Sequence, residues 1–176
     1  MKWLNIIQPW SLSTSENGQV VVGKTSGNVF VYGPDGEMTA TVSLSSLGLE
    51  FPLHVLQSST GNWIVCHGEG EYALRRIVEM DRDGKVIDSF GGLCGDGPTQ
   101  LDNPLHMALA GDQIVVADRR LLLIDRRPMK LSRILLDKSP PTQRRSPSRV
   151  YFVRDCGRLL VGFRISGIVQ VYEPIN

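Results

Sequence analysis

Four similar segments, each opened by a proline, constrain the fold of this chain more than any other feature of its sequence. The prolines are Pro9, Pro52, Pro104 and Pro147, so the segments follow one another at spacings of 43, 52 and 43 residues. Repeats of this length are typical of β-propeller blades and of helical solenoids. The residues inside each repeat must therefore distinguish these two architectures.

Each repeat contains short apolar runs bounded by turn-forming residues. A turn rich in Gly, Asn and Asp follows each proline-opened segment, as in Glu16–Gly18 and Asp155–Gly157. Two runs rich in β-branched and aromatic residues come next, and these are strand and hairpin signals. No window carries an apolar stripe with a 3.6-residue period over ten or more residues, which excludes helical repeats. The first runs are Val20–Val22, Trp63–Cys66, Ile114–Val116 and Leu159–Val161.

A fourth strand is predicted in three of the repeats, at residues 38–44, 85–90 and 130–136. The last repeat reaches Asn176 without one. Residues 1–7 stand directly before the first repeat, where a fourth strand belongs, and we expect them to complete the last blade. Sharing one sheet between the two ends of the chain closes the ring with backbone hydrogen bonds. The sequence thus predicts a single all-β domain over residues 1–176, a four-bladed β-propeller with four antiparallel strands per blade.

The junction between the second and third repeats resembles the NHL-repeat β-propellers. Ser89–Gly92, Leu101–Ala108 and Ile114–Asp118 match the family's Phe-Gly exit, its Leu before Pro and its Val-Ala-Asp strand. The last repeat, residues 157–172, is similar to the closing blade of NHL domains in tripartite-motif-type proteins. The resemblance implies a binding module, because some NHL propellers bind proteins and others bind RNA on a basic face.

The charges of this chain are strongly asymmetric, although the net charge is only +1. Residues 119–164 hold 13 Lys and Arg against 3 acids, whereas residues 1–118 hold 6 against 14. A propeller with this sequence is therefore expected to have an acidic half and a basic half.

The loops of a propeller divide these cations between two faces. Loops between blades and between second and third strands share one face, where we predict a binding site. Arginine suits the recognition of carboxylate or phosphate, because its planar fork donates two hydrogen bonds at once. The residues predicted for this site are Arg119, Arg120, Lys138, Arg144, Arg145 and Arg164. Those expected on the opposite face are Arg126, Arg127, Lys130, Arg154 and Arg158.

Three interpretations of the basic face remain open. The first is a site for an acidic segment of a protein partner, and the second is RNA binding through the same surface. Residues 119–149 contain no Phe, Tyr or Trp on which bases would stack. Tyr151, Phe152 and Phe163 alternate in predicted strands and are assigned to the core. The third interpretation is ordinary solvated loop charge.

Two positions after each blade-opening proline, the repeats carry a ring of polar residues that begins the innermost strands. These residues are Ser11, His54, His106 and Arg149, and we expect them at the mouth of the central channel. Two imidazoles there suit a metal or an anion, but no carboxylate or thiolate joins them and Arg149 repels a cation. We therefore predict no metal, no cofactor and no catalytic residue, and we keep a channel-mouth metal hydrolase as the least favoured class.

The remaining features concern location and regulation. The start of the chain lacks a signal-peptide core, no stretch reaches the length of a membrane helix, and Cys66, Cys94 and Cys156 do not form a disulfide framework. We expect a cytoplasmic protein, not bound to membranes, that is a monomer rather than a dimer. The loop Ser139–Arg149 has Ser-Pro pairs and an Arg-Arg-Ser sequence, so Ser146 is a candidate phosphorylation site.

Overall fold

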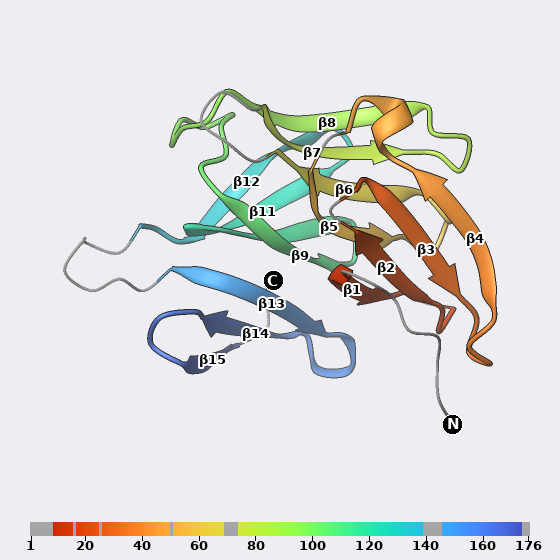
Figure 1. The fold of residues 1–176 in the computed structure, drawn as a ribbon. Coiled ribbons are helices and arrows are strands. Elements are labelled where there is room, and N and C mark those ends of the chain that lie inside the picture. Colours follow the sequence, from red (N-terminus) through yellow and green to blue (C-terminus); the bar gives the residue numbers. More distant parts are fainter. Residues whose placement is uncertain are drawn as a thin grey trace.

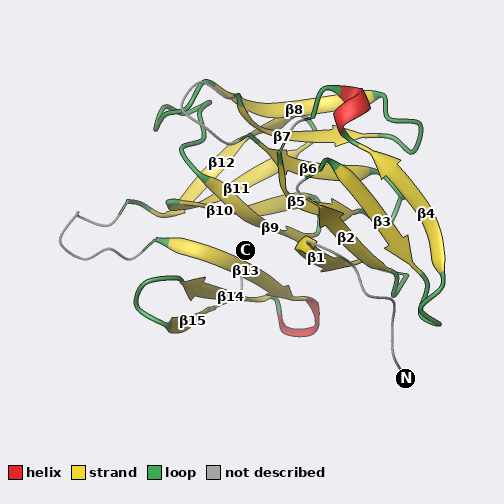
Figure 2. Ribbon diagram, in the orientation of Figure 1, coloured by secondary structure: helices red, strands yellow, loops and turns green. Residues whose placement is uncertain are grey.

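The computed structural model describes residues 9–15, 17–24, 26–49, 51–68, 74–138 and 146–173. These residues form four antiparallel sheets, each built from strands that are consecutive in the chain (Figures 1 and 2). Three sheets have four described strands and the last has three. Two 3-10 turns, Ser45–Leu47 and Arg154–Cys156, are the helical elements of the described part. The structure is the four-bladed β-propeller that the repeats predicted.

The strands of each blade run from the centre of the ring outward. Blade 1 consists of β1 (Pro9–Thr14), β2 (Val20–Lys24), β3 (Asn28–Tyr32) and β4 (Met38–Ser43). Blade 2 consists of β5 (Pro52–Gln57), β6 (Trp63–His67), β7 (Arg75–Met80) and β8 (Val86–Gly92). Blade 3 consists of β9 (Pro104–Ala110), β10 (Gln113–Asp118), β11 (Arg120–Arg126) and β12 (Met129–Leu136). Blade 4 consists of β13 (Pro147–Val153), β14 (Arg158–Phe163) and β15 (Ile168–Tyr172).

A hairpin that contains a glycine joins the first and second strands of every blade, although its length differs between blades. The glycines are Gly18, Gly61, Gly111 and Gly157, with φ of 73°, 83°, 62° and 67°. This left-handed backbone conformation strains residues that carry a Cβ, whereas glycine adopts it freely. The glycine of each repeat therefore fixes where the innermost strand ends and the buried second strand begins.

Three hydrophobic clusters hold neighbouring blades together, because the sheets bury apolar side chains on the faces they turn toward each other. Val21 and Val31 of blade 1 pack with Val65 and Val78 of blade 2. Blades 2 and 3 share the largest cluster, which includes Ile64, Ile77, Ile114 and Leu122. Blades 3 and 4 share the cluster of Val115, Leu123, Leu159 and Val161.

No such cluster joins blade 4 to blade 1 within the described residues. The predicted closing strand, residues 1–7, lies outside these residues, so its pairing with the last blade stays a prediction. The assignment of Tyr151 to the core was wrong, because its side chain is 62% exposed, whereas Phe163 is buried. No helix in the described part of the chain is long and apolar enough to cross a membrane.

Candidate binding face and central channel

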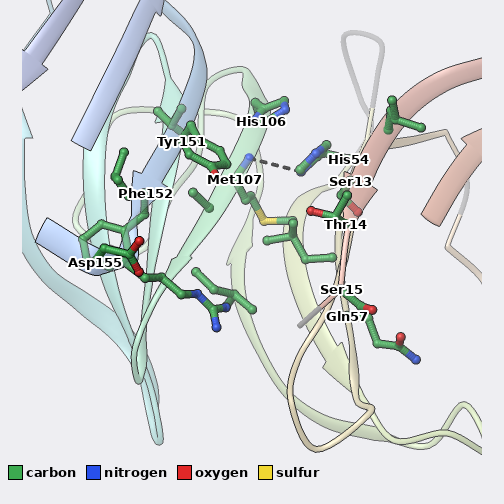
Figure 3. A pocket seen from close by; sticks show the side chains of 17 residues that line it. Ser13, Thr14, Ser15, His54, Gln57, His106, Met107, Tyr151, Phe152 and Asp155 are labelled. Carbon is green, nitrogen blue, oxygen red and sulfur yellow. Dashed lines mark hydrogen bonds between the residues drawn. The ribbon is translucent and has the colours of Figure 1, made fainter. Parts of the chain in front are cut away.

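The innermost strands β1, β5, β9 and β13 surround a central channel that contains two cavities. The cavity at the strand starts, which we call the arginine chamber, has a volume of about 680 Å3. The cavity toward the strand ends, which we call the tyrosine chamber, has a volume of about 520 Å3 and is drawn in Figure 3. Leu12, His54 and His106 line both chambers, so the two histidines stand between them. The arginine chamber is lined by Trp10, Ser11, Leu12, Leu53, His54, Leu105, His106, Ser148, Arg149 and Arg164.

The four residues predicted at the channel mouth come together in the arginine chamber. Ser11, His54, His106 and Arg149 all line it, each from the innermost strand of a different blade. The structure thus brings these four repeat-equivalent residues to one cavity.

The two channel histidines form a stacked pair. Their ring centroids are 3.7 Å apart and the ring planes differ by 28°. The backbone N–H of Met107 donates to His54 Nδ1 at 3.3 Å (Figure 3), so the neutral ring of His54 carries its proton on Nε2. The pair thus connects blade 2 to blade 3 at the centre of the ring.

Burial keeps both histidines neutral. It is the main reason that the pKa of His54 lies well below its ordinary value, and the charges of His106 and Arg149 lower it further, while the Leu12 carbonyl acts in the opposite direction. Burial and then Arg149 lower the pKa of His106 to about 4, against the effect of the Val150 carbonyl. Since Leu12 belongs to blade 1 and Val150 to blade 4, groups of all four blades meet at this pair.

Arg120, predicted to contact a partner, is instead an internal structural residue. Its side chain is buried and pairs with Asp118 at 3.1 Å. Its guanidinium also donates to the carbonyls of Asp96 and Gln100 at 2.8 and 3.0 Å. The group therefore anchors the segment that leads from blade 2 into blade 3, and no part of it is available at the surface.

Lys138 and Arg119 lie on the predicted face, but acids accompany them. Lys138 Nζ is 2.5 Å from Asp96 and 2.8 Å from Asp102, and Arg119 is 3.5 Å from Asp102. Burial favours the neutral acid at Asp102, but the hydrogen bond from Lys138 and the charge of Arg119 outweigh it and lower its pKa. The positive charge of this group is therefore largely neutralised within the protein.

Arg164 is placed differently from the other predicted cations. It is exposed, follows β14 directly and lines the arginine chamber beside Arg149. None of the described residues that line this chamber is acidic. Arg144 and Arg145 lie outside the described residues, so their predicted role stays a prediction.

Trp10 is a further candidate residue that the sequence reasoning missed. Its side chain is 52% exposed and lines the arginine chamber with Arg149 and Arg164. More than 130 residues separate it from Arg149 in the chain, so a search for aromatic residues near the basic segment could not find it. The polar lining includes the buried Ser11 Oγ and His106 Nδ1, neither of which has a hydrogen-bond partner within the described structure.

On the opposite face, Arg126 is also internal. It pairs with the buried carboxylate of Glu79 at 2.6 Å, and Asn62 donates to the same carboxylate at 2.9 Å. Burial opposes ionisation of Glu79, but Arg126 and Asn62 outweigh it and hold the pKa of this acid below its usual value. No group of three or more His, Cys, Asp or Glu side chains with the spacing of a metal site occurs among the described residues.

Comparison with known proteins supports the fold. No protein-family model matches the chain, and no curated protein matches its sequence. Among solved structures, the WD40 domain of Neurospora crassa Pan2 is 12% identical, with a TM-score of 0.53 over 94% of this chain. The β-propeller domain of Myceliophteria thermophila Cps50 (Swd1) is 13% identical, with a TM-score of 0.59 over 95%. Hydrazine synthase of Kuenenia stuttgartiensis is 16% identical, with a TM-score of 0.61 over 98%.

These likenesses concern architecture alone. The chain spans 50%, 51% and 47% of the three matched chains, respectively, or about half of each. Two of the three are propeller domains of the WD40 and related type, and one belongs to an enzyme. The three likenesses therefore show that the chain has the β-propeller fold.

Proposed function

We propose that this chain is a non-enzymatic, NHL-type propeller that binds an acidic segment of a partner protein at the arginine chamber. The observation that carries the proposal is the charge of the chamber, where Arg149 and Arg164 meet and the described lining residues include no carboxylate. The other described cations predicted for this face, Arg119, Arg120 and Lys138, already pair with acids of the protein. An incoming carboxylate thus finds positive charge that the fold leaves without a counter-charge.

The chemistry of the channel supports a binding role rather than catalysis. The side chains around the arginine chamber are two neutral imidazoles, two hydroxyls, two guanidinium groups and apolar residues. The described lining includes no carboxylate of the kind that a metal-dependent hydrolase uses. Neither hydroxyl is hydrogen-bonded to an imidazole as a nucleophile–base pair would be, because Ser11 Oγ has no partner in the described structure and Ser148 Oγ donates to the Gly162 carbonyl. The Phe-Gly and Val-Ala-Asp elements at residues 89–118 support the NHL assignment, and the free thiols of Cys66, Cys94 and Cys156 support a cytoplasmic location.

RNA binding is the second candidate, and Trp10 favours it. An exposed indole beside two arginines is the combination that stacks an unpaired base and contacts its phosphate. One aromatic platform supports one stacked base, however, and the described lining of the chamber offers no second exposed aromatic side chain. We therefore place the acidic protein segment first.

Fluorescence anisotropy with two labelled probes tests the proposal. The probes are a ten-residue peptide rich in Asp and Glu and a ten-nucleotide oligouridylate. We expect the peptide to bind, to lose affinity at least tenfold with Arg149→Glu plus Arg164→Glu, and to weaken as salt rises. Arg158→Glu is the matched control, because Arg158 is exposed but lies at the opposite end of β14 from Arg164.

Two outcomes would contradict the proposal. If the oligouridylate binds more tightly than the peptide and Trp10→Ala removes that binding, the RNA candidate replaces it. If Arg158→Glu weakens the peptide as much as the double variant does, the net charge of the protein, not the chamber, attracts the probe.

A further inference from the structure

The facing surfaces of blade 4 and blade 1, which we call the seam, are apolar and exposed. In blade 4, the strand register aligns Tyr151, Leu160 and Val171 in one row across the sheet. The opposite face of this sheet, with Val150 and Val161, packs on blade 3. Tyr151 and Val171 are 62% and 59% exposed, so the face turned away from blade 3 is left uncovered.

Blade 1 shows the same pattern. Its face with Val21 and Val31 packs on blade 2, and the register aligns Leu12, Val22 and Phe30 on the other face. Leu12, on the innermost strand, is 65% exposed, whereas Val22 beside it is buried, so the exposed part of this face lies at the channel. Leu12 and Tyr151 both line the tyrosine chamber, so the two apolar faces meet at the channel.

The arginine chamber lies at one end of this apolar surface. Arg149 is on the same face of blade 4 as Tyr151, two residues earlier on β13 and aligned with Gly162 and Val169. A ligand that leaves the chamber along β13 therefore meets a cation first and apolar side chains next. A complementary ligand therefore carries an acidic residue first and apolar residues after it.

An extended segment fits such a surface better than a helix does. Side chains of a strand point alternately to opposite sides, so one set contacts Leu12 on blade 1 and the other contacts Tyr151 and Val171 on blade 4. In the described structure β1 pairs only with β2, and β13 pairs only with β14. On these strands the Leu12 and Val150 carbonyls already interact with the histidine pair, so the segment contacts the seam through its side chains.

From these observations we propose that the seam binds an extended, alternating apolar segment that directly follows the acidic residue held in the arginine chamber. This proposal rests on the function proposed above and names the kind of segment that the partner presents. The ligand is thus an acidic residue followed by apolar residues at every second position.

Selection from a random twelve-residue peptide library, with the whole chain as bait, tests the proposal. We expect the selected peptides to share Asp or Glu followed by alternating apolar residues. Leu12→Asp or Val171→Lys should weaken their binding at least tenfold. Val86→Lys is the matched control, because Val86 is an apolar residue of comparable exposure on the outermost strand of blade 2, and it should leave binding unchanged.

The outcomes separate this proposal from the one on which it rests. If Arg149→Glu plus Arg164→Glu abolishes binding while Leu12→Asp and Val171→Lys do not, the acidic site stands and the seam proposal is wrong. If only the seam variants matter, the acidic site is wrong and the apolar docking stands. If sedimentation shows a dimer that Leu12→Asp dissociates, or if peptides bind only after removal of residues 1–8, another occupant fills the seam and the proposal is overturned.

Discussion

The interface between blades 2 and 3 and the seam between blades 4 and 1 are built in opposite ways. Blades 2 and 3 share the largest hydrophobic cluster, and an ion pair joins Glu79 of blade 2 to Arg126 of blade 3. Arg120 of blade 3 adds hydrogen bonds to the carbonyls of Asp96 and Gln100, in the segment that connects the two blades. The seam has exposed apolar side chains and no described cluster or ion pair. Repeats of one kind thus produce one interface that is tightly packed and one that exposes apolar side chains.

The two regions also differ in how far ion pairs neutralise the charges of the chain. Blade 2 and the segment after it supply Glu79, Asp96 and Asp102, and blade 3 supplies many of the cations that pair with them. The acidic and basic halves of the chain therefore meet at the interface between blades 2 and 3, where ion pairs neutralise much of their charge. Arg149 and Arg164, near the seam, have no such partners in the chamber lining.

Removal of the buried carboxylate at the interface between blades 2 and 3 is expected to have the largest effect. Glu79→Ala leaves the buried guanidinium of Arg126 without its counter-charge, which costs about 3–5 kcal/mol in the free energy of unfolding. Urea denaturation measures this loss. Arg127→Ala is the control, because its exposed side chain lies 3.6 Å from the same carboxylate, and such a pair is worth less than about 1 kcal/mol. Equal losses in both variants would mean that the buried pair with Arg126 stabilises the fold no more than the exposed pair with Arg127 does.

Truncation of an apolar side chain should have very different effects in the two regions. Ile114→Ala opens a cavity in the cluster between blades 2 and 3 and should cost about 3 kcal/mol. Leu12→Ala at the seam should cost less than about 0.5 kcal/mol, because the side chain is already mostly exposed. Both values come from urea midpoints at constant m-value. A large loss at Leu12 would show that the seam is a closed interface in solution.

Acidification tests the histidine pair, where groups of all four blades meet. The pKa of His106 is lowered to about 4 in the folded protein, below the value of about 6.5 in an unfolded chain. The unfolded state therefore binds the proton first, and stability present above pH 6.5 is lost as the pH falls toward 4. His106 should account for about 2–3 kcal/mol of this loss. Denaturation at pH 7 and pH 4.5 measures it, and an unchanged pH dependence in His106→Gln would refute the assignment.

The smallest effect is expected at Lys138. Lys138→Ala removes cation pairs at a partly exposed site and should lower the free energy of unfolding by less than about 1 kcal/mol. Salt at 1 M should reduce the difference from the unmodified protein, since exposed pairs are screened. Thermal denaturation at low and high salt provides the measurement. A loss as large as that of Glu79→Ala would show that the ion pairs of Lys138 stabilise the fold as much as the buried pair on the opposite face.

Sequence patterns located the blades and the channel residues well. The prolines and the hairpin glycines recur at equivalent points, so counting from Pro52 and Pro104 was enough to bring His54 and His106 together in space. Such counting cannot tell which cations face acids, because Asp96 and Lys138 are 42 residues apart and meet only through packing of neighbouring blades. Arg120 was assigned to the surface for this reason, although the fold buries it.

The amino-acid sequence alone determined the architecture, since strand periodicity and turn residues are local properties that each repeat carries by itself. It also determined the ring of Ser11, His54, His106 and Arg149, because equivalent positions of a repeat become neighbours around the axis. Only the tertiary structure decided which arginines form ion pairs with acids and which apolar side chains are exposed. These properties depend on contacts between blades, where burial and ion pairing join residues that no local pattern connects.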